Sequence, residues 1–248
     1  MLKRLFTIPV LYLLLVGCEQ DTVRRLDFAV EGIDVSHHQA RIDWQQVAEQ
    51  ELDFAFVKAT EGATHTDSLF CDNWEAIRSV GMIRGAYHFF RPQTSAMAQA
   101  FQFMHWVDLQ PGDLPPVLDI EVLDGVPHPH LLDGLRTWLW LTELHYGVKP
   151  ILYTNLKFYN RYLAGHFNEY PLWIARYSGR EPILANGSAW RFWQYGNRGT
   201  LPGVDGYVDF NVFSGDSVAL QELTIPSQAI LSGRALTSNC IDMITWGQ

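Results

Sequence analysis

The feature that most constrains the fold of this 248-residue chain is a repeated alternation of short apolar or β-branched runs with helix-like segments. The runs have the length of buried strands, and between them apolar residues recur at spacings of three and four. We predict strands at 32–36, 54–60, 83–90, 116–122, 150–155, 172–177, 191–195 and 208–213. We predict helices at 43–50, 69–80, 95–106, 130–145 and 155–163. This order indicates an α/β fold, a TIM-like barrel of five βα units followed by three β-strands.

The beginning of the chain has the pattern of a lipoprotein signal peptide. Lys3 and Arg4 precede an apolar run to Val16 that is too short to cross a bilayer as a stable helix. The run ends in Leu-Val-Gly before Cys18, which resembles the lipobox of bacterial lipoproteins. We therefore expect cleavage before Cys18 and attachment of lipid to it. An ordinary signal peptide that ends near a cysteine by coincidence is the alternative.

These patterns divide the chain into a signal peptide at 1–17, a lipidated Cys18 with linker at 18–30, one barrel domain at 31–222 and a C-terminal tail at 223–248. We expect an exported protein that is anchored to a membrane by its lipid. If the source is Gram-negative, Glu19 favours the outer membrane facing the periplasm, because an Asp in this position resembles an inner-membrane retention signal. Cys71 and Cys240 either form a disulfide or are two unrelated thiols.

The charge of the chain excludes one class of partner. It has 18 Lys and Arg against 27 Asp and Glu, a net charge of −9, and loss of Lys3 and Arg4 with the signal peptide would make it still more acidic. Proteins that bind nucleic acid need basic surface to replace phosphate counterions. We therefore expect no nucleic-acid partner.

Acidic residues lie where the predicted strands end. Asp119 and Glu121 are spaced by two in an apolar run, so strand alternation places both on one face with Cα atoms roughly 6.6 Å apart. Asp34 and Asp209 have similar places in two other strands. The C-terminal ends of parallel barrel strands converge on one mouth, so the four acids share a pocket. Crowded carboxylates raise one another's pKa, which can keep a Glu protonated as a general acid. Either Asp34 or Asp209 alone would more simply be a turn or helix cap.

Aromatic residues flank these acids and can stack on the apolar faces of sugar rings. They are Tyr87, Tyr153, Trp173, Trp193 and Tyr195. Strand aromatics are mostly core residues, and we expect that of about half of this set. Trp138 and Trp140 fall in a predicted helix, where we expect them to pack. The pair His37-His38 suggests a metal, but there is no HExxH and no Cys/His cluster with zinc spacing. We expect no metal, no cofactor and a loop or surface role for the two histidines.

Nine short blocks of this sequence resemble, in order, the family 25 glycoside hydrolases, the Chalaropsis-type lysozymes. The blocks are 32–36, 42–44, 56–62, 85–89, 118–121, 152–155, 173–177, 193–195 and 208–211. The resemblance covers about residues 31 to 214 and implies a barrel of five βα units and three strands. It also implies N-acetylmuramidase activity on peptidoglycan glycan strands, at the β-1,4 bond from N-acetylmuramic acid to N-acetylglucosamine.

The resemblance also implies roles for single residues. Glu121 matches the family's general acid/base, Asp119 its partner carboxylate, and Asp34 and Asp209 the further acids of the pocket. The positions that match the sugar groove are Tyr87, Tyr153, Trp173, Gln194 and Tyr195. His37-His38 stand where the family usually has smaller or aromatic residues, and the chain after Phe213 has no family pattern. A peptidoglycan-binding lipoprotein without turnover is the main alternative, and a metal-dependent amidase or deacetylase is a second.

Overall fold

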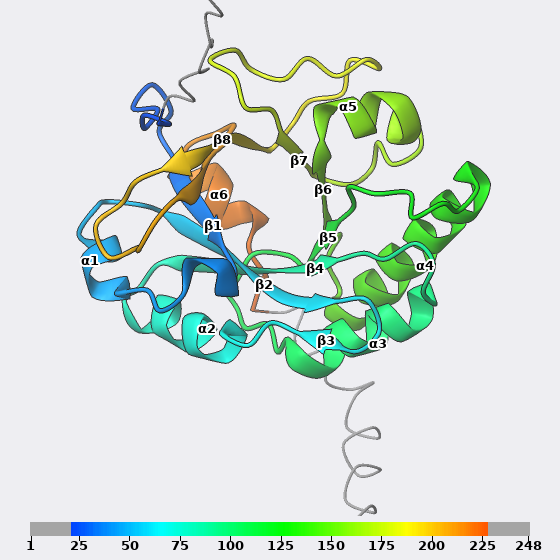
Figure 1. Cartoon of the computed structure of the whole chain (residues 1–248), viewed down its shortest axis with the longest axis horizontal. Coiled ribbons are helices and arrows are strands. Elements are labelled where there is room, and N and C mark those ends of the chain that lie inside the picture. Colours follow the sequence, from blue (N-terminus) through cyan, green and yellow to red (C-terminus); the bar gives the residue numbers. More distant parts are fainter. Residues whose placement is uncertain (1–20, 228–248) are drawn as a thin grey trace, which may run out of the picture.

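The computed structural model describes residues 21–227, which form nine strands, eight of them closed into a barrel (Figure 1). The strands are β1 Glu31–Val35, β2 Phe54–Glu61, β3 His65–Thr66, β4 Ile83–Phe89, β5 Val117–Asp119, β6 Ile151–Asn155, β7 Leu172–Ala175, β8 Phe192–Gly199 and β9 Val208–Phe213. Their order is β1-β9-β8-β7-β6-β5-β4-β2, and the pairing of β1 with β2 closes the ring. The short β3 pairs with β2 outside this ring. The predicted TIM-like α/β barrel is confirmed.

One strand of the barrel runs against the others. Strands β1, β2 and β4 to β8 follow one another in parallel, whereas β9 is antiparallel to both β8 and β1. The expectation that all the acids lie at C-terminal strand ends is therefore wrong for Asp209. This residue is the second of β9, and because β9 is reversed, its N-terminal end lies at the same mouth as the C-terminal ends of the parallel strands.

Helices cover the outside of the barrel and follow the first five barrel strands (Figure 1). They are α1 Trp44–Ala48, α2 Phe70–Ser79, α3 Ala96–Trp106, α4 His128–Tyr146 and α5 Leu156–Phe158, the last continuing into a π-helical turn at Tyr159–Leu163. The side chain of Asp43 accepts from the backbone N–H groups of Gln45 and Gln46 and caps the start of α1. After β9, α6 Ser217–Leu223 closes the end of the barrel opposite the mouth, with Leu220 packed among interior residues.

The interior of the barrel is filled below the mouth. A Cβ on Gly32 would lie 2.5 Å from the carbonyl oxygen of Phe54, and one on Gly85 would lie 2.5 Å from the ring of Phe56, so only glycine leaves room for these rings. The Phe56 ring stacks on Trp173 with centroids 4.3 Å apart. Stacked rings therefore form a floor, and side chains nearer the mouth stand above it.

A second core lies between the barrel and its helices. Trp138 is buried there as expected, but Trp140 on the same helix is 61% exposed, so the expectation that it packs is wrong. The two residues are two apart, which places them on different faces of α4. Ile225 is also buried in this core, and the predicted boundary at residue 222 falls inside α6.

Three predictions concern residues outside the described range. Cys18 and the signal peptide lie there, and so does Cys240, while its predicted partner Cys71 is an exposed residue of α2. Lipidation and the disulfide therefore stay predictions. Between residues 21 and 227, no helix combines the length and the apolar character needed to span a bilayer.

Candidate active site

A pocket of about 240 Å³ opens at the mouth of the barrel and contains all four predicted acids. We call it the mouth pocket. It is lined by Asp34, Ser36, His38, Lys58, Tyr87, Phe89, Asp119, Glu121, Tyr153, Trp173, Tyr177, Gln194 and Asp209. These side chains come from all eight strands of the barrel and from loops that follow some of them. The fold thus brings together acids that are up to 175 positions apart in the chain, the separation of Asp34 from Asp209.

Asp119 and Glu121 reach the mouth pocket from different local structures. Strand β5 ends at Asp119, where its registers with Phe89 of β4 and Tyr153 of β6 also end. The predicted strand to residue 122 is therefore too long, because beyond Asp119 the chain leaves the sheet and enters the loop that leads to α4. Asp119 points into the barrel from the strand, and Glu121 approaches from the loop. Strand alternation does not account for their shared pocket.

Asp34 and Asp209 face each other across β1 and β9. The two carboxyl groups are close enough to influence each other's ionisation, because the charge of one opposes the loss of a proton from the other. Burial, followed by the nearby charge of Asp209, raises the pKa of Asp34 well above its ordinary value. Burial also raises the pKa of Asp209, to about 6. The pair therefore holds a proton under conditions in which isolated carboxyls would be ionised.

Two amides fix the position of Asp34. Its Oδ2 accepts from Gln194 Nε2 at 2.8 Å and from Asn211 Nδ2 at 2.7 Å. The indole Nε1 of Trp173 donates to Asn211 Oδ1 at 2.8 Å. Because an indole can only donate, the oxygen of Asn211 must face Trp173, and its nitrogen must face Asp34. Trp173 is 2% exposed, so its main contribution at this site is to orient Asn211.

Gln194 is oriented in the same way by two phenols. Tyr153 Oη donates to Gln194 Oε1 at 2.8 Å, and Tyr177 Oη donates to the same oxygen at 3.1 Å. The amide nitrogen is thereby left to donate to Asp34. Tyr153 is buried, whereas Tyr177 exposes more than half of its surface at the rim of the pocket. The network is thus rigid at its base and exposed at its edge.

Asp119 is buried without full hydrogen bonding. Burial raises its pKa well above the ordinary value, the charge of Glu121 raises it further, and the charge of Lys58 opposes these effects. Lys58 is itself engaged, since its Nζ lies 2.6 Å from Glu61 Oε2. Among the described residues, Asp119 Oδ1 has no hydrogen-bond partner. A buried carboxyl oxygen in this condition is costly unless a ligand supplies a donor.

Glu121 is the more accessible of the two neighbouring acids. Burial raises the pKa of Glu121 above its ordinary value, while a hydrogen bond from Asn155 lowers it. Asn155 Oδ1 accepts from the backbone N–H of Phe158 at 2.9 Å and caps α5, which directs the amide nitrogen toward Glu121. Asn155 thus positions Glu121 and favours its ionised form, while burial favours the protonated one.

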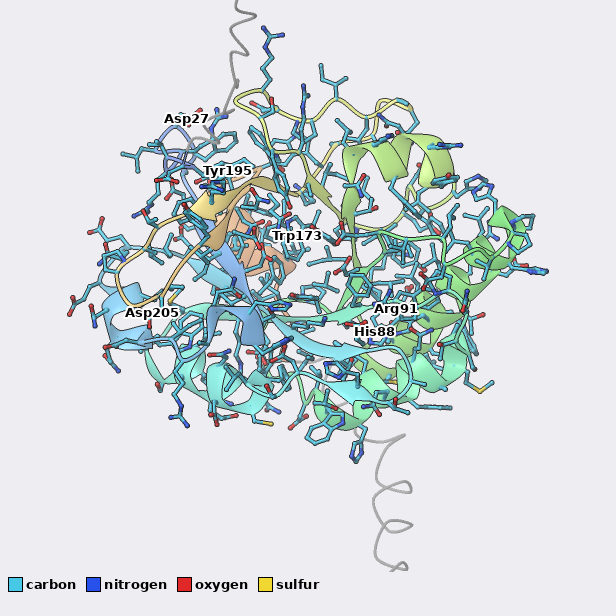
Figure 2. All side chains as sticks on the ribbon, viewed as in Figure 1. Asp27, His88, Arg91, Trp173, Tyr195 and Asp205 are labelled. Carbon is cyan, nitrogen blue, oxygen red and sulfur yellow. The ribbon has the colours of Figure 1, made fainter. Side chains whose placement is uncertain are left out.

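The structure does not bring Tyr195 into the mouth pocket. Side chains alternate along β8, so Gln194 points into the barrel, and Trp193 and Tyr195 point out of it. The Oη of Tyr195 accepts from the backbone N–H of Arg25 at 3.2 Å. In Figure 2, Trp173 lies toward the centre of the barrel, whereas Tyr195 lies toward the N-terminal segment that carries Asp27. Of the five residues predicted to line the sugar groove, the other four line the mouth pocket.

Sequence reasoning missed several residues of the site: Ser36, His38, Lys58, Phe89, Asn155, Tyr177 and Asn211. A signal for Lys58 was present, because a lysine in the middle of an apolar strand is costly to bury without a functional or structural partner.

The two histidines follow β1 in a short 3-10 turn, His37–Gln39, and their rings are 4.1 Å apart. His37 Nδ1 lies 2.6 Å from Asp67 Oδ2, and His38 reaches the pocket. Within residues 21–227, no group of three or more His, Cys, Asp or Glu is arranged to hold a metal ion.

Comparison with known proteins places this architecture in a family. Residues 33–204 match the sequence model of the glycosyl hydrolases of family 25. The chain is 47% identical over 199 residues to the uncharacterized protein YegX of Escherichia coli (strain K12), covering 78% of this chain and 73% of that protein. It is 34% identical over 224 residues to Lysozyme M1 of Streptomyces globisporus, covering 84% and 76%. The structure of a family 25 glycosyl hydrolase from Bacillus anthracis superposes with a TM-score of 0.78 at 33% identity, covering 83% of this chain and 98% of that one. The chain belongs to the glycosyl hydrolases of family 25.

Proposed function

We propose that this glycoside hydrolase is an N-acetylmuramidase that cleaves peptidoglycan at the β-1,4 bond from N-acetylmuramic acid to N-acetylglucosamine, with Glu121 as general acid. The observation that carries the proposal is the cluster of four carboxyl groups with raised pKa at the barrel mouth. Glycosidic bonds are cleaved by such carboxyl groups, one protonated and one stabilising positive charge. The names of related proteins, among them Lysozyme M1 and the N,O-diacetylmuramidase of Chalaropsis sp., support the substrate class.

Glu121 is the group that protonates the leaving oxygen. It is partly exposed to the pocket, and burial keeps its proton bound to higher pH than in an ordinary glutamate. As the bond to the leaving sugar breaks, positive charge develops on the ring oxygen and anomeric carbon of the other sugar. The neighbouring carboxyls of Asp119 and the Asp34–Asp209 pair stabilise that charge. Glu121 regains a proton from the attacking water, either directly or, if Asp119 takes that proton first, by exchange through solvent, and this restores the enzyme.

Asp119 has two candidate roles. It can hold the N–H of the substrate's 2-acetamido group while the acetamido oxygen attacks the anomeric carbon, or it can take a proton from an attacking water directly. The buried, unpartnered Oδ1 of Asp119 supports the first role, because an amide N–H is the donor this oxygen lacks. Attack by the acetamido group followed by water retains the β configuration. Proton NMR of the first product anomer separates the two roles, and an α product would contradict retention.

Mass spectrometry of digested sacculi tests the proposed bond specificity. We expect soluble fragments with N-acetylmuramic acid at the reducing end. Reducing-end N-acetylglucosamine would indicate a glucosaminidase, and release of peptides with intact glycan would indicate an amidase, so either contradicts the proposal. Binding of sacculi without new reducing ends would instead support the peptidoglycan-binding lipoprotein. Loss of activity with a chelator would favour a metal-dependent enzyme.

We also propose that the protein is exported and anchored by lipid at Cys18, in the outer membrane facing the periplasm if the source is Gram-negative. Two residues separate Cys18 from Asp21, so an extended chain there reaches at most about 11 Å. The lipid would hold the barrel by the segment that pairs with the end of β8. Labelled palmitate should enter the wild type but not Cys18→Ser, and the variant should leave the membrane fraction. Unlabelled wild type in the soluble fraction would contradict this.

A further inference from the structure

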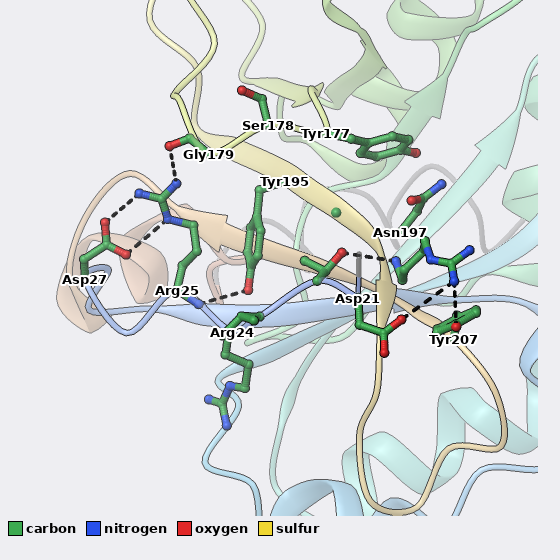
Figure 3. Close-up of a pocket in the computed structure, with 14 residues that line it drawn as sticks. Asp21, Arg24, Arg25, Asp27, Tyr177, Ser178, Gly179, Tyr195, Asn197 and Tyr207 are labelled. Atoms are coloured by element: carbon green, nitrogen blue, oxygen red, sulfur yellow. Dashed lines mark hydrogen bonds and ion pairs between the residues drawn. The ribbon is translucent and has the colours of Figure 1, made fainter. Parts of the chain in front are cut away.

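A second, larger cleft adjoins the mouth pocket. We call it the N-terminal cleft. It has a volume of about 960 Å³, and its walls are residues 21–25 and 27, residues 177–179 after β7, residues 195–198 of β8, and Tyr207 (Figure 3). Tyr177 lines both the N-terminal cleft and the mouth pocket. The two spaces therefore meet at one exposed aromatic ring.

The sizes of the two spaces indicate that they hold different parts of a polymeric substrate. At about 240 Å³, the mouth pocket is smaller than the roughly 300–1,000 Å³ typical of ligand sites, and it is filled largely by the groups that do chemistry. A polymeric substrate extends well beyond the bond that is cleaved. The N-terminal cleft lies at the upper end of the typical range and begins where the mouth pocket ends. It has room for the sugars that the mouth pocket cannot hold.

One wall of the N-terminal cleft comes from a segment that precedes the family-matched region at 33–204. Thr22 forms a parallel bridge with Gly199, and its N–H donates to the carbonyl of Arg198 at 3.0 Å. Its side chain lies against Gly196, where a Cβ would collide with it. The segment is thus built onto the end of β8, and Gly196 is the position that allows the contact.

Arg25 ties the same segment to the opposite wall. Its guanidinium donates to both carboxylate oxygens of Asp27, at 3.1 and 2.7 Å, and to the carbonyl of Gly179 at 3.0 Å (Figure 3). It also lies over the ring of Trp193, 4.8 Å from the centroid. These contacts hold the N-terminal segment against the loop after β7. The cleft therefore has fixed walls on both sides.

The two spaces differ in charge. The mouth pocket has four acids and one lysine, whereas the N-terminal cleft has three arginines, at 24, 25 and 198, and two aspartates. Arg198 lies over the ring of Tyr207 at 4.4 Å and donates to its hydroxyl at 2.8 Å. Each arginine of the cleft is paired with a carboxylate, Arg24 with Glu31, Arg25 with Asp27 and Arg198 with Asp21, so the acidic and basic charges there are balanced. The mouth pocket therefore repels an anionic group, whereas the N-terminal cleft does not and presents guanidinium groups that can donate to one. Exposed Tyr177 and Tyr207 supply rings on which sugars can stack.

We propose that the N-terminal cleft binds the glycan strand beyond the cleaved bond, with the acidic groups of peptide-bearing muramic acid facing its arginines. The cleft thereby selects polymeric, peptide-substituted glycan over short or unsubstituted fragments. The proposal rests on the proposed muramidase function, because it assigns the continuation of that substrate. It gives residues 21–27 a role in recognition in addition to their place between Cys18 and the barrel.

Calorimetry on the Glu121→Gln variant tests the proposal without turnover. The probes are a tetrasaccharide and an octasaccharide of alternating N-acetylglucosamine and N-acetylmuramic acid, each with and without stem peptides. We expect the peptide-bearing octasaccharide to bind about tenfold more tightly than the tetrasaccharide, and added salt to weaken its binding more than that of the peptide-free form. Equal affinity for both lengths, or no difference in salt dependence, would overturn the proposal.

Two further substitutions locate the effect. Tyr207→Ala should remove most of the octasaccharide's advantage and leave tetrasaccharide binding unchanged, whereas Tyr207→Phe, which keeps the ring, should stay within about twofold of the parent. Gly196→Val should displace Thr22 and act like Tyr207→Ala. If wild type digests sacculi while Tyr207→Ala binds the octasaccharide normally, the cleft assignment alone is wrong. If wild type releases no reducing ends, the muramidase function itself is wrong.

Discussion

Two clusters of buried charge in this barrel are built in opposite ways. Arg84 of β4 is 2% exposed, and its guanidinium donates to both oxygens of Asp113, at 2.9 and 3.2 Å, and to the carbonyl of Trp74 at 2.7 Å. The Trp74 ring lies 3.9 Å from its charged centre. At the mouth, four acids lie together, and the nearby cation, Lys58, is already paired with Glu61.

The difference separates a charge cluster that stabilises the fold from one that serves catalysis. A buried charge is tolerated when an opposite charge and full hydrogen bonding compensate its lost hydration, as at Arg84. The mouth acids lack that compensation, and burial together with neighbouring acids raises the pKa values of Asp34, Asp119 and Asp209. Glycosidic cleavage uses such a cluster in two ways, because one carboxyl, here Glu121, must carry a proton to act as the acid and a neighbouring carboxylate must stabilise positive charge.

The largest stability effect is expected at the compensated cluster. Arg84→Met leaves Asp113 buried without its partner, so we expect the free energy of unfolding in urea to fall by about 3–5 kcal/mol. Arg136→Met is the matched control, because Arg136 forms an exposed pair with Asp133 and is 52% exposed. The free energy of unfolding of that control should fall by less than about 1 kcal/mol. Similar losses in the two variants would remove the basis of the comparison.

Substitution of an acid in the mouth pocket should lower activity and leave stability unchanged or increased. Asp119→Asn removes one of several crowded carboxyls, so we expect the free energy of unfolding to stay unchanged or to rise by about 1 kcal/mol. Release of reducing ends from sacculi should fall by about 10²-fold or more, because Asp119 no longer stabilises charge at the reacting sugar. Asp113→Asn, at the paired site, should destabilise the fold without this loss of activity per folded molecule. Strong destabilisation by Asp119→Asn would mean that Asp119 is a structural residue.

A smaller effect is expected in the pH dependence of activity. Glu121 must be protonated to act as an acid, so activity should fall as pH rises through its pKa. The hydrogen bond from Asn155 lowers that pKa, and Asn155→Ala should therefore move the high-pH limb of kcat/KM upward. Asn155→Asp keeps an oxygen that can cap α5 and adds a negative charge, so it should move the limb further in the same direction. A downward shift in either variant would contradict the assignment of that limb to Glu121.

The sequence predicts the barrel and its acids because both depend on local patterns. Apolar runs mark the strands, and acids within them mark the mouth. The direction of β9 could not be read locally, since the same alternation of side chains suits either direction. The alternation of side chains along β8 could have excluded Tyr195 from the mouth pocket, because Gln194 and Tyr195 are adjacent and face opposite sides of the sheet. The contact of Thr22 with Gly196 joins residues that no local pattern connects.

The most direct test of the central claim is the release of reducing ends from purified sacculi by Glu121→Gln. The variant keeps the size of the side chain but has no carboxyl proton to donate, so we predict a wild-type melting temperature and a loss of about 10²–10⁴-fold in activity. Asp72→Asn, at an exposed acid in the first turn of α2, is the control and should behave like wild type. Wild-type rates from a folded Glu121→Gln protein would contradict the account.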